Sequence, residues 1–438
     1  MNIEALYSCF LQHPIVTTDS RDVPEGSMFF ALKGESFDGN QYAQAALDKG
    51  AAYAVVDDPS VQGDYIILVP DVLKALQQLA HHHRCQLGTT IVGITGTNGK
   101  TTTKELIAAV LQKKYNVLFT QGNFNNHIGV PKTLLQLTKE HDIAVVEMGA
   151  NHPGEIKTLV DIVYPDYGLI TNLGRAHLEG FGSFEGVVKT KGELYDFLRS
   201  DAGTAFINND NPHLRGISHD LRLIKYGQTP ADDLLVQGEF IDCNPTLHFR
   251  WQQQGSPFSP MDVQTQLIGS YNLDNALAAA CVGTLFAVPA DDISAALSEY
   301  TPSNNRSQLT KTADNQLIVD AYNANPTSMT AALDSFAHVK ADRKMVILGD
   351  MKELGEVSQT EHKAILDRLA ALQLQQVWLV GSEFQKALQA NPAVSARTFD
   401  NVDEMKTLLA TPDGKPRDYT ILVKGSNSTR LIQLIELL

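Results

Sequence analysis

The feature that most constrains this fold is a glycine-rich loop between a run of β-branched residues and a helical segment. Residues 89–95 predict a strand, residues 104–113 predict a helix, and the sequence GITGTNGKT joins them. A strand that enters and a helix that leaves such a loop allow backbone N–H groups to surround phosphate oxygens. The pattern therefore predicts a nucleotide-binding phosphate loop that consists of Thr95, Gly96, Thr97, Asn98, Gly99, Lys100 and Thr101.

Two side chains of this loop carry the expected chemistry. Lys100 can reach the β and γ phosphates of ATP, and the hydroxyl of Thr101 can bind Mg²⁺. The strict phosphate-loop pattern has a glycine where this chain has Ile94, because the glycines here stand at 93, 96 and 99. The alternative is an unrelated glycine-rich turn, which the flanking strand and helix disfavour.

Strands alternate with helices after this loop, which predicts an α/β protein. Strand-like runs at 116–120, 142–148, 167–171 and 203–208 are separated by helical patterns. This order is typical of a mostly parallel sheet with helices on both faces. Residues 225–265 contain short strands and polar turns, which predict a small antiparallel insertion.

The chain is too long for one ordinary core, and its patterns divide it into three domains. Residues 1–88 hold short apolar runs and end in a helix, whose histidines at 81–83 we interpret as a solvated helix end. Residues 89–299 form the central parallel-sheet domain with the phosphate loop. Residues 300–438 alternate strands and helices again and predict a second open, Rossmann-like α/β domain.

Composition disfavours several classes of partner. The net charge of −15 would repel nucleic acid or an anionic membrane surface. No apolar run reaches the roughly 18–20 residues of a membrane span, and the N-terminus, MNIEALYSCF, lacks the basic segment of a signal peptide. The cysteines form no CxxC pair, which disfavours a disulfide framework or a zinc site. We therefore expect a cytoplasmic protein, and we expect a monomer.

Two residues that follow strand-like runs are candidate metal ligands. Glu147 ends the run 142–148, and a carboxylate at the carboxyl end of a strand suits Mg²⁺ beside a nucleotide. His177 lies in the loop TNLGRAHLEGFGS, where a histidine can bind a metal or act as an acid–base group. The alternatives are a solvated strand end for Glu147 and a structural loop position for His177.

A polar turn and a helical segment add further candidates. The turn QGNFNNHIGVP contains Asn123 and Asn126, which can cap the following helix or bind substrate. Lys189 and Lys191 lie in a predicted helix at 184–198, and by pattern alone both are solvated.

These motifs occur in one order that resembles the Mur ligase family over essentially the whole chain. The remaining shared features are TKGELY around Lys191, YNLDNALAA with Asn272 and Asn275, Arg306, and Asp320 with Asn323. Many family members have histidine where this chain has Tyr271.

The resemblance implies nucleotide and substrate ligands beyond the loop. Asn275 would touch adenine, and Arg306 and Asp320 would reach the nucleotide from the C-terminal domain. The implied substrate ligands are Asp19, Ser20 and Arg21, near the uridine of a UDP substrate, and Asn123, Asn126 and Asn323.

The resemblance also implies a metal centre. Glu147 and His177 would hold Mg²⁺, and Thr101 would support a second ion at the phosphates. A lysine that matches Lys191 is often carbamylated in this family, and the resulting carboxylate supports Mg²⁺. The implied catalytic residues are Lys100, His177, Lys191 and Arg306.

The implied reaction is ATP-dependent formation of a carbon–nitrogen bond through an acyl phosphate. Segments such as 122–135, 320–329 and 348–355 resemble the member that joins D-alanyl-D-alanine to UDP-N-acetylmuramoyl-tripeptide in peptidoglycan precursor synthesis. Both meso-diaminopimelate and lysine remain candidates for the third residue of the tripeptide. The rival functions are a sibling ligase for another amino acid, a folylpolyglutamate-synthetase-like enzyme, which generally lacks the first domain, and a nucleotide-dependent switch without ligase chemistry.

Overall fold

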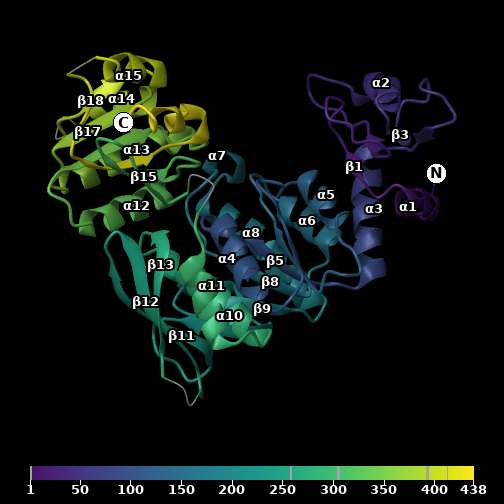
Figure 1. Cartoon of the computed structure of the whole chain (residues 1–438), viewed down its shortest axis with the longest axis horizontal. Coiled ribbons are helices and arrows are strands. Elements are labelled where there is room, and N and C mark those ends of the chain that lie inside the picture. The colour runs from purple at the N-terminus through teal and green to yellow at the C-terminus, as the bar shows by residue number, and fades with distance from the viewer. Residues whose placement is uncertain (1, 257–258, 303–305, 391–393, 412) are drawn as a thin grey trace.

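The chain folds around three separate β-sheets, which confirms the predicted α/β class. The structure, a computed structural model, describes residues 2–256, 259–302, 306–390, 394–411 and 413–438. The sheets of this described chain have four, nine and six strands. Figure 1 shows the N-terminal and C-terminal parts at opposite ends of the central part.

The N-terminal part is a small sheet in which neighbouring strands are parallel and follow the sequence order β1–β2–β3–β4. The sequence predicted the helix α3 and noted short apolar runs, which here form β3 and β4, whereas β1 and β2 are too short to give a clear pattern. The elements are α1 (Ile3–Gln12), β1 (Val16–Thr17), β2 (Met28–Phe30), α2 (Ala43–Asp48), β3 (Tyr53–Val56), β4 (Ile66–Leu68) and α3 (Val72–Leu87).

The central part is a nine-stranded sheet with helices on both faces. Its strands have the order β13-β12-β11-β10-β9-β8-β5-β7-β6, and neighbours from β11 to β6 are parallel. Its strands are β5 (Thr90–Thr95), β6 (Val117–Phe119), β7 (Ile143–Glu147), β8 (Tyr167–Ile170), β9 (Thr204–Asn208), β10 (Arg222–Gly227), β11 (Leu234–Cys243), β12 (Thr246–Gln253) and β13 (Met261–Ile268). Its helices are α4 (Lys100–Leu111), α5 (Gly129–Leu134), α6 (Glu155–Val163), α7 (Leu178–Phe181), α8 (Phe184–Ser200), α9 (Pro212–Ile217), α10 (Asn272–Leu285) and α11 (Ala290–Glu299).

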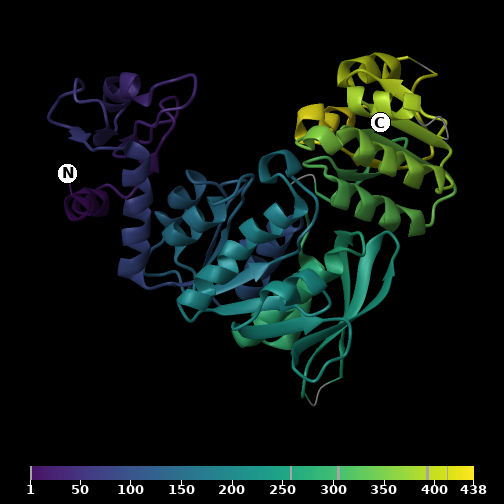
Figure 2. The same ribbon diagram turned by 180° about the vertical axis from the view of Figure 1, so that it is seen from behind.

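The predicted antiparallel segment extends this sheet and does not stand apart from it. Strand β11 pairs with β10 in parallel, and β12 and β13 then add to the edge as antiparallel strands. Figure 2 shows these strands beneath the C-terminal part. There, Asn244 Oδ1 accepts a hydrogen bond of 3.1 Å from the backbone N–H of Lys340. The segment therefore also supports the C-terminal part.

Helix α3 joins the N-terminal and central parts through one continuous apolar cluster, which includes residues of α1, α3, α5 and α6. Polar contacts reinforce the joint: the His83 ring lies 2.9 Å from the carbonyl oxygen of Leu137, and Arg84 donates to the Asp166 carboxylate at 2.9 Å. The interpretation of residues 81–83 as a solvated helix end is wrong for His83, because its ring is buried in this joint.

The C-terminal part is a six-stranded sheet in the order β14-β15-β19-β16-β17-β18. Only the β14–β15 pair is antiparallel among these described strands, which confirms the predicted open α/β arrangement. The elements are β14 (Gln308–Lys311), β15 (Gln316–Asp320), α12 (Pro326–His338), β16 (Lys344–Gly349), α13 (Ser358–Ala370), β17 (Gln376–Val380), α14 (Ser382–Ala390), β18 (Arg397–Phe399), α15 (Val402–Leu409) and β19 (Thr420–Lys424).

The strand order of the central sheet creates the crevice for a ligand. Strand β5 lies between β7 and β8: the chain passes from β5 to β6 and β7 on one side and then crosses to β8 on the other side. Ligands of open α/β sheets bind at such a point, beyond the carboxyl ends of the strands. Thr95 ends β5 and Glu147 ends β7, so both candidate residues reach this crevice.

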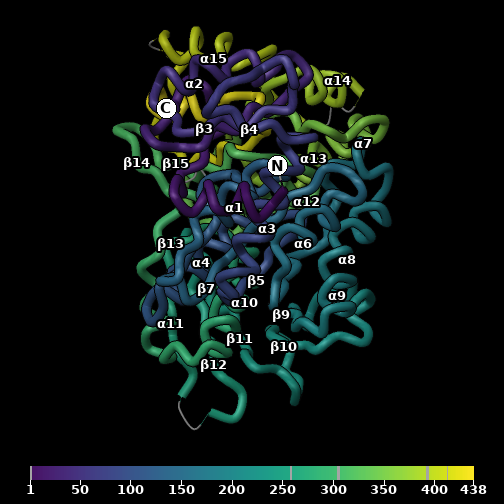
Figure 3. The backbone as a smooth tube through the Cα atoms, turned by 90° about the vertical axis from the view of Figure 1, so that its right-hand side faces the viewer, coloured from purple at the N-terminus to yellow at the C-terminus, as the bar shows by residue number. Residues whose placement is uncertain are grey.

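Both terminal parts stand on the same side of the central part, as Figures 1 and 3 show from two directions. Among the helices of the described ranges, none combines the length and the apolar character that crossing a bilayer requires.

Candidate active site

The phosphate loop adopts a backbone conformation that depends on its glycines. Gly96 has φ 142° and Gly99 has φ 77°, values that L-residues with side chains rarely adopt. A Cβ atom on Gly96 would lie 2.0 Å from Thr171 Oγ1. Helix α4 begins directly after Gly99, so its amino end faces the loop, where its backbone N–H groups favour an anion.

Two side chains of the loop suit a phosphate ligand. Lys100 Nζ donates to the carbonyl oxygens of Gly96 at 2.8 Å and Thr97 at 3.1 Å. Burial lowers the pKa of Lys100, and the nearby Glu147 carboxylate opposes this shift. Thr95 Oγ1 is buried and has no hydrogen-bond partner among the described residues. Phosphate oxygens would provide acceptors for both the ammonium group and this hydroxyl.

Glu147 is buried at the end of β7, with only 1% of its surface exposed. Thr101 Oγ1 donates to one carboxylate oxygen at 2.9 Å, and Asn125 Nδ2 donates to the other at 2.8 Å. The Glu147 backbone N–H donates to Thr120 Oγ1 at 3.0 Å. The alternative of a solvated strand end is therefore excluded, and the carboxylate is held against the phosphate loop.

These oxygen atoms fit Mg²⁺. Mg²⁺ in nucleotide sites takes one or two protein oxygens and completes its shell with phosphate oxygens and water. Glu147 and Thr101 provide two adjacent oxygen donors. In the described parts of the chain, no group of three or more His, Cys, Asp or Glu side chains could hold a metal by itself. An ion at this place would therefore depend on the nucleotide for several of its ligands.

Neighbouring asparagines of the polar turn before α5 make different contacts. Asn126 Oδ1 accepts hydrogen bonds from the N–H groups of Ile128 and Gly129, at 3.1 and 2.8 Å, where α5 begins. Asn123 accepts a backbone hydrogen bond of 2.7 Å from Asn125. The sequence singled out Asn123 and Asn126, but Asn125 is the one that reaches the buried carboxylate. Three asparagines in one turn carry no pattern that distinguishes them.

Lys191 lies in the interior, so the interpretation of a solvated lysine is wrong for it, whereas Lys189 is exposed as expected. Lys191 Nζ donates to the carbonyl oxygen of Ala150 at 3.1 Å and lies 5.4 Å from the centre of the Phe181 ring. Burial, followed by the positive charge of Lys100, lowers the pKa of Lys191 well below its ordinary value. A lysine in such surroundings readily becomes the neutral amine, which is the nucleophilic form.

His177 lies at the junction between the central and C-terminal parts. It precedes α7 with φ 51°, and its ring is hydrogen-bonded to the Glu353 carboxylate. Burial lowers the pKa of His177, and the carboxylate of Glu353 acts in the opposite direction. The charges of Lys100 and Lys191 lower this pKa further. The three basic groups are therefore close enough to act on one another.

Asn275 lies beneath the phosphate loop. Its Oδ1 accepts a hydrogen bond of 3.0 Å from Thr103 Oγ1, and its Nδ2 donates to Asn272 Oδ1 at 2.8 Å. A Cβ atom on Gly99 would lie 2.6 Å from Asn275 Oδ1. The side chain is thus packed directly against the loop.

Two candidates of the C-terminal part lie at the end of β15. Asp320 forms an ion pair of 2.5 Å with Lys424 at the end of β19. Lys424 also donates to the carbonyl oxygen of Asn323 at 3.3 Å. The sequence analysis did not single out Lys424, which lies in the sequence LVKGS at the carboxyl end of β19, the strand beside β15.

Arg306 connects the C-terminal part electrostatically with the phosphate loop. Its guanidinium group lies 3.9 Å above the ring of Tyr322, a distance typical of a cation–π contact. Its positive charge lowers the pKa of Lys100, so the two cations are near each other.

Direct contacts also join the two parts. Asn325 Nδ2 donates to Asn98 Oδ1 at 2.7 Å. The Arg175 backbone N–H donates to Thr327 Oγ1 at 3.0 Å, and its guanidinium group forms an ion pair of 2.8 Å with Glu361. Sequence reasoning missed these contacts, because Asn325 before Pro326 indicates the start of a helix and nothing about its partner.

Asp19, Ser20 and Arg21 form a separate cluster in the N-terminal part. Arg21 donates to the Asp19 carboxylate at 2.7 Å, and this hydrogen bond is the main cause of a lowered pKa of Asp19. Lys49 Nζ donates to the carbonyl oxygen of Ser20 at 2.6 Å. The positive charge of Lys132, in the central part, also lowers the Asp19 pKa.

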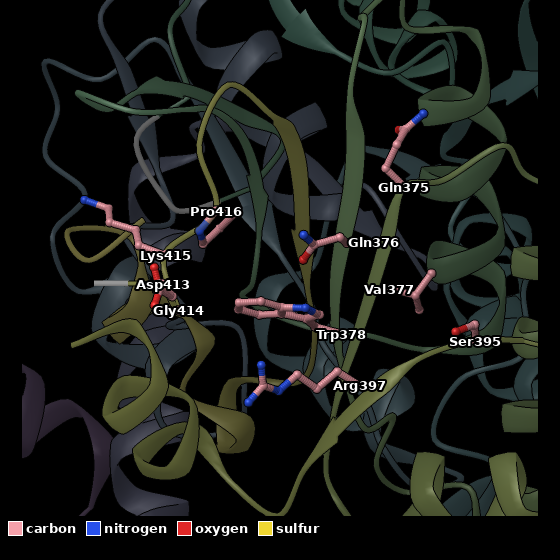
Figure 4. Close-up of a pocket in the computed structure, with 10 residues that line it drawn as sticks. All are labelled: Gln375, Gln376, Val377, Trp378, Ser395, Arg397, Asp413, Gly414, Lys415 and Pro416. Carbon is pink, nitrogen blue, oxygen red and sulfur yellow. The ribbon is translucent and has the colours of Figure 1, made fainter. Parts of the chain in front are cut away.

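A cavity of about 310 Å³ lies elsewhere, on the C-terminal part. It opens between β17, β18 and the segment 413–416, and Trp378, Arg397 and Lys415 are among its lining residues (Figure 4). No predicted site residue lines it, and Lys415 is already paired with Asp314 at 2.7 Å. It is therefore distinct from the candidate active site.

Family models match most of the chain. Residues 14–84 match the model described as "Mur ligase family, catalytic domain", residues 94–283 match "Mur ligase middle domain", and residues 305–427 match "Mur ligase, glutamate ligase domain".

Individual proteins are similar over nearly the full length. The UDP-N-acetylmuramoyl-tripeptide–D-alanyl-D-alanine ligase of Escherichia coli is 36% identical over 97% of this chain and 93% of its own. A crystal structure of MurF from Acinetobacter baumannii has a TM-score of 0.86 at 31% identity and covers 96% of this chain and 93% of that one. MurF ligase from Thermotoga maritima in complex with ADP has a TM-score of 0.85 at 27% identity, with 98% and 97% covered.

Proposed function

The chain belongs to the Mur ligase family, and from this membership we propose that it joins D-alanyl-D-alanine to UDP-N-acetylmuramoyl-tripeptide at the expense of ATP. The products are UDP-N-acetylmuramoyl-pentapeptide, ADP and phosphate, and the reaction belongs to peptidoglycan precursor synthesis. The observation that carries this function is the full-length similarity to relatives named for this reaction. The phosphate loop, with Lys100 and the buried carboxylate of Glu147, supplies the matching chemistry.

ATP overcomes the poor reactivity of a carboxylate toward an amine. The terminal carboxylate of the tripeptide attacks the γ-phosphorus, an oxygen–phosphorus bond forms, and ADP leaves with the electrons of the broken bond. The amine of D-alanyl-D-alanine then attacks the carbonyl carbon of the acyl phosphate, loses a proton, and expels inorganic phosphate. Lys100 and the amino end of α4 stabilise negative charge on the phosphoryl oxygens.

Glu147 and Thr101 would hold Mg²⁺ beside the phosphates, and the ion would neutralise charge on the β and γ oxygens. His177 would add a ligand to a metal at the same site. Lys191 supports this arrangement in the carbamylated form, because its burial favours the neutral amine that can add carbon dioxide. The carbamate would turn a buried cation into a carboxylate that faces the metal.

The C-terminal part would supply the remaining ligands of the site. Arg306 and Asp320 would contact the nucleotide, Asn323 would contact substrate, and Asn275 would approach the adenine from beneath the loop. Closure of this part would exclude water, which would otherwise hydrolyse the acyl phosphate.

We assign the uridine end of the substrate to the N-terminal part, near Asp19, Ser20 and Arg21, and peptide contacts to Asn123 and Asn126. The proposed domains are 1–88 for the UDP substrate, 89–299 for ATP, and 300–438 for the amine and for closure. The three separate sheets support this division. We further propose that the protein works as a cytoplasmic monomer.

The deciding experiment measures phosphate release from ATP and Mg²⁺ with UDP-N-acetylmuramoyl-tripeptide, with and without D-alanyl-D-alanine. We expect release only with both substrates, together with the pentapeptide by mass spectrometry. A response to a single amino acid would instead support a sibling ligase. A response to a folate acceptor would support a folylpolyglutamate-synthetase-like enzyme, and release that needs no acceptor would support a nucleotide switch.

A further inference from the structure

The amino end of helix α12 contacts two loops of the central part at once. Asn325 donates to Asn98 of the phosphate loop at 2.7 Å, and Thr327 Oγ1 accepts from the backbone N–H of Arg175 at 3.0 Å. Asn325 is buried, with 4% of its surface exposed. Asn98 Nδ2 in turn lies 3.5 Å from Asn325 Oδ1, so a reciprocal pair of side-chain contacts joins the phosphate loop to the buried amino end of α12.

The orientation of the Asn325 amide follows from its hydrogen bonds. Its Oδ1 accepts from the backbone N–H of Ser328 at 2.8 Å and thereby caps α12, which directs the NH₂ group toward Asn98 Oδ1. Ser328 Oγ accepts from the Asn325 backbone N–H at 3.1 Å, which completes a capping box. The helix cap thus fixes the donor that reaches the phosphate loop.

Asn98 is held from both sides of the junction. Its backbone N–H donates to Asn172 Oδ1 at 3.0 Å, and its carbonyl oxygen accepts from Thr171 Oγ1 at 2.6 Å. These two contacts come from the central part, whereas its side chain is held by Asn325. The conformation of the loop at Asn98 therefore depends on whether the C-terminal part is docked.

We propose that Asn325 is a positioning residue that couples docking of the C-terminal part to the shape of the phosphate loop. It is assigned no contact with the reacting atoms or with the nucleotide, and it acts through Asn98. Docking favours the loop shape that receives phosphates, and a bound nucleotide favours docking in return. The expected effect on kcat rests on the proposed ligase function, whereas the expected effect on ADP binding does not.

Two substitutions separate this role from the helix cap. Asn325→Ser keeps a capping oxygen but is too short to reach Asn98. Asn325→Asp keeps both the capping oxygen and the side-chain length, and it loses the N–H donor. The matched control is Ser328→Ala, which removes the other half of the capping box and leaves the contact with Asn98 in place.

The full-length variants are measured for kcat, for KM of UDP-N-acetylmuramoyl-tripeptide, and for the Kd of ADP by calorimetry. We expect both Asn325 variants to lower kcat and to weaken ADP binding by about five- to tenfold, the effect of losing one hydrogen bond. The KM of the UDP substrate should stay within about twofold, because its uridine end is assigned to the distant N-terminal part. Ser328→Ala should resemble the unmodified protein in all three quantities.

A double-mutant cycle with Asn98→Ala tests whether the two residues act through each other. We expect Asn325→Ser to add nothing to kcat or to the ADP Kd in the Asn98→Ala background. Three results would each overturn the proposal. The effects of Asn325→Ser and Asn98→Ala on kcat and on the ADP Kd could multiply, Asn325→Asp could leave both quantities unchanged, or Ser328→Ala could lower kcat and ADP affinity as much as the Asn325 variants do. If the unmodified protein ligates no amine, the proposed function fails, and the cycle on the ADP Kd still decides the role of Asn325.

Discussion

At the scale of single residues, the site depends on charges that are buried near one another. Lys191 and Glu147 are both buried, and the charges of Lys100 and Glu147 both act on the pKa of Lys191. Burial of a lysine without a closely paired carboxylate costs free energy. Such a residue is retained where its chemistry is needed, which is why perturbed pKa values indicate functional sites.

Replacement of Lys100 tests the phosphate loop. We expect Lys100→Ala to reduce kcat by at least about a hundredfold, since a preorganised charge at the transferring phosphoryl group is lost. The melting temperature should change little, because Lys100 contacts only loop carbonyl groups among the contacts described. Lys189→Ala, at an exposed position, is the control. Near-normal turnover by folded Lys100→Ala protein would refute the phosphate-loop assignment.

Replacement of Lys191 tests the carbamate. We expect Lys191→Ala to lose activity by at least about ten- to a hundredfold, as for other groups that support a metal site. Short carboxylates such as acetate or formate should restore part of it by occupying the space beside the metal. Activity is measured against carboxylate concentration, with chloride at equal ionic strength as the control. Full activity in the variant without added carboxylate would remove the carbamate from the mechanism.

At the scale of secondary structure, the sequence predicted those elements that have a strong local pattern. The run before the loop forms β5, and β6, β7, β8, β9 and the helix α8 lie within a few residues of their predicted positions. The short N-terminal strands were missed, because two or three residues cannot show alternation. The buried place of His83 was also missed, because it depends on α5 and α6, which only the folded chain brings to α3.

The same distinction applies to the candidate site. Residues beside a local motif, such as Lys100, Thr101 and Glu147, could be chosen from sequence because a strand end or a glycine loop marks them. Asn325 and Glu353 could not, because their partners lie 227 and 176 residues away in the sequence. Burial of Lys191 depends equally on packing that its helical pattern does not reveal.

The turn from β5 into α4 provides a test at this scale. We expect Gly96→Ala to abolish detectable ATP binding, because the new Cβ would overlap Thr171 Oγ1 and the backbone would be strained by about 1–3 kcal/mol. Gly216→Ala on α9 is the matched control, since its Cβ would meet no heavy atom within 4 Å. Calorimetric ATP titration of both variants is the measurement. Unchanged ATP affinity in Gly96→Ala would mean that the loop does not need this conformation.

At the scale of the whole molecule, the two joints differ in how many apolar side chains the parts share, because the apolar cluster of the C-terminal part includes Ile268 of the central part. The N-terminal and central parts share one apolar cluster around α3. The contacts described between the phosphate-loop side of the central part and the C-terminal part are mainly polar, such as Arg175 with Glu361 and His177 with Glu353. Polar contacts that are accessible to water separate at lower cost than a shared apolar core. We therefore expect the C-terminal part to move and the other two to move together.

A charge swap tests this joint. We expect Arg175→Glu to lower kcat/KM by about three- to tenfold. The variant loses an ion pair with Glu361 that contributes roughly 0.2–1 kcal/mol, and it places two carboxylates beside each other. The double variant Arg175→Glu with Glu361→Arg should regain most of the loss. Steady-state rates at low and high salt are the measurement, with a smaller difference expected at high salt. Failure of the swap to restore any activity would show that the pair does not serve closure.

The shared core around α3 has a consequence for the choice of substrate. If Asp19, Ser20 and Arg21 hold the uridine, the span from that cluster to Lys100 depends on the apolar packing and hydrogen bonds that hold α3 between the N-terminal and central parts. The distance between the two sites would then select the substrate by length, because only a peptide stem of the right length brings its carboxylate to the phosphate. A UDP-N-acetylmuramoyl-dipeptide should occupy the uridine site as a competitor and yet react far more slowly, and equal turnover would show that the span is adjustable.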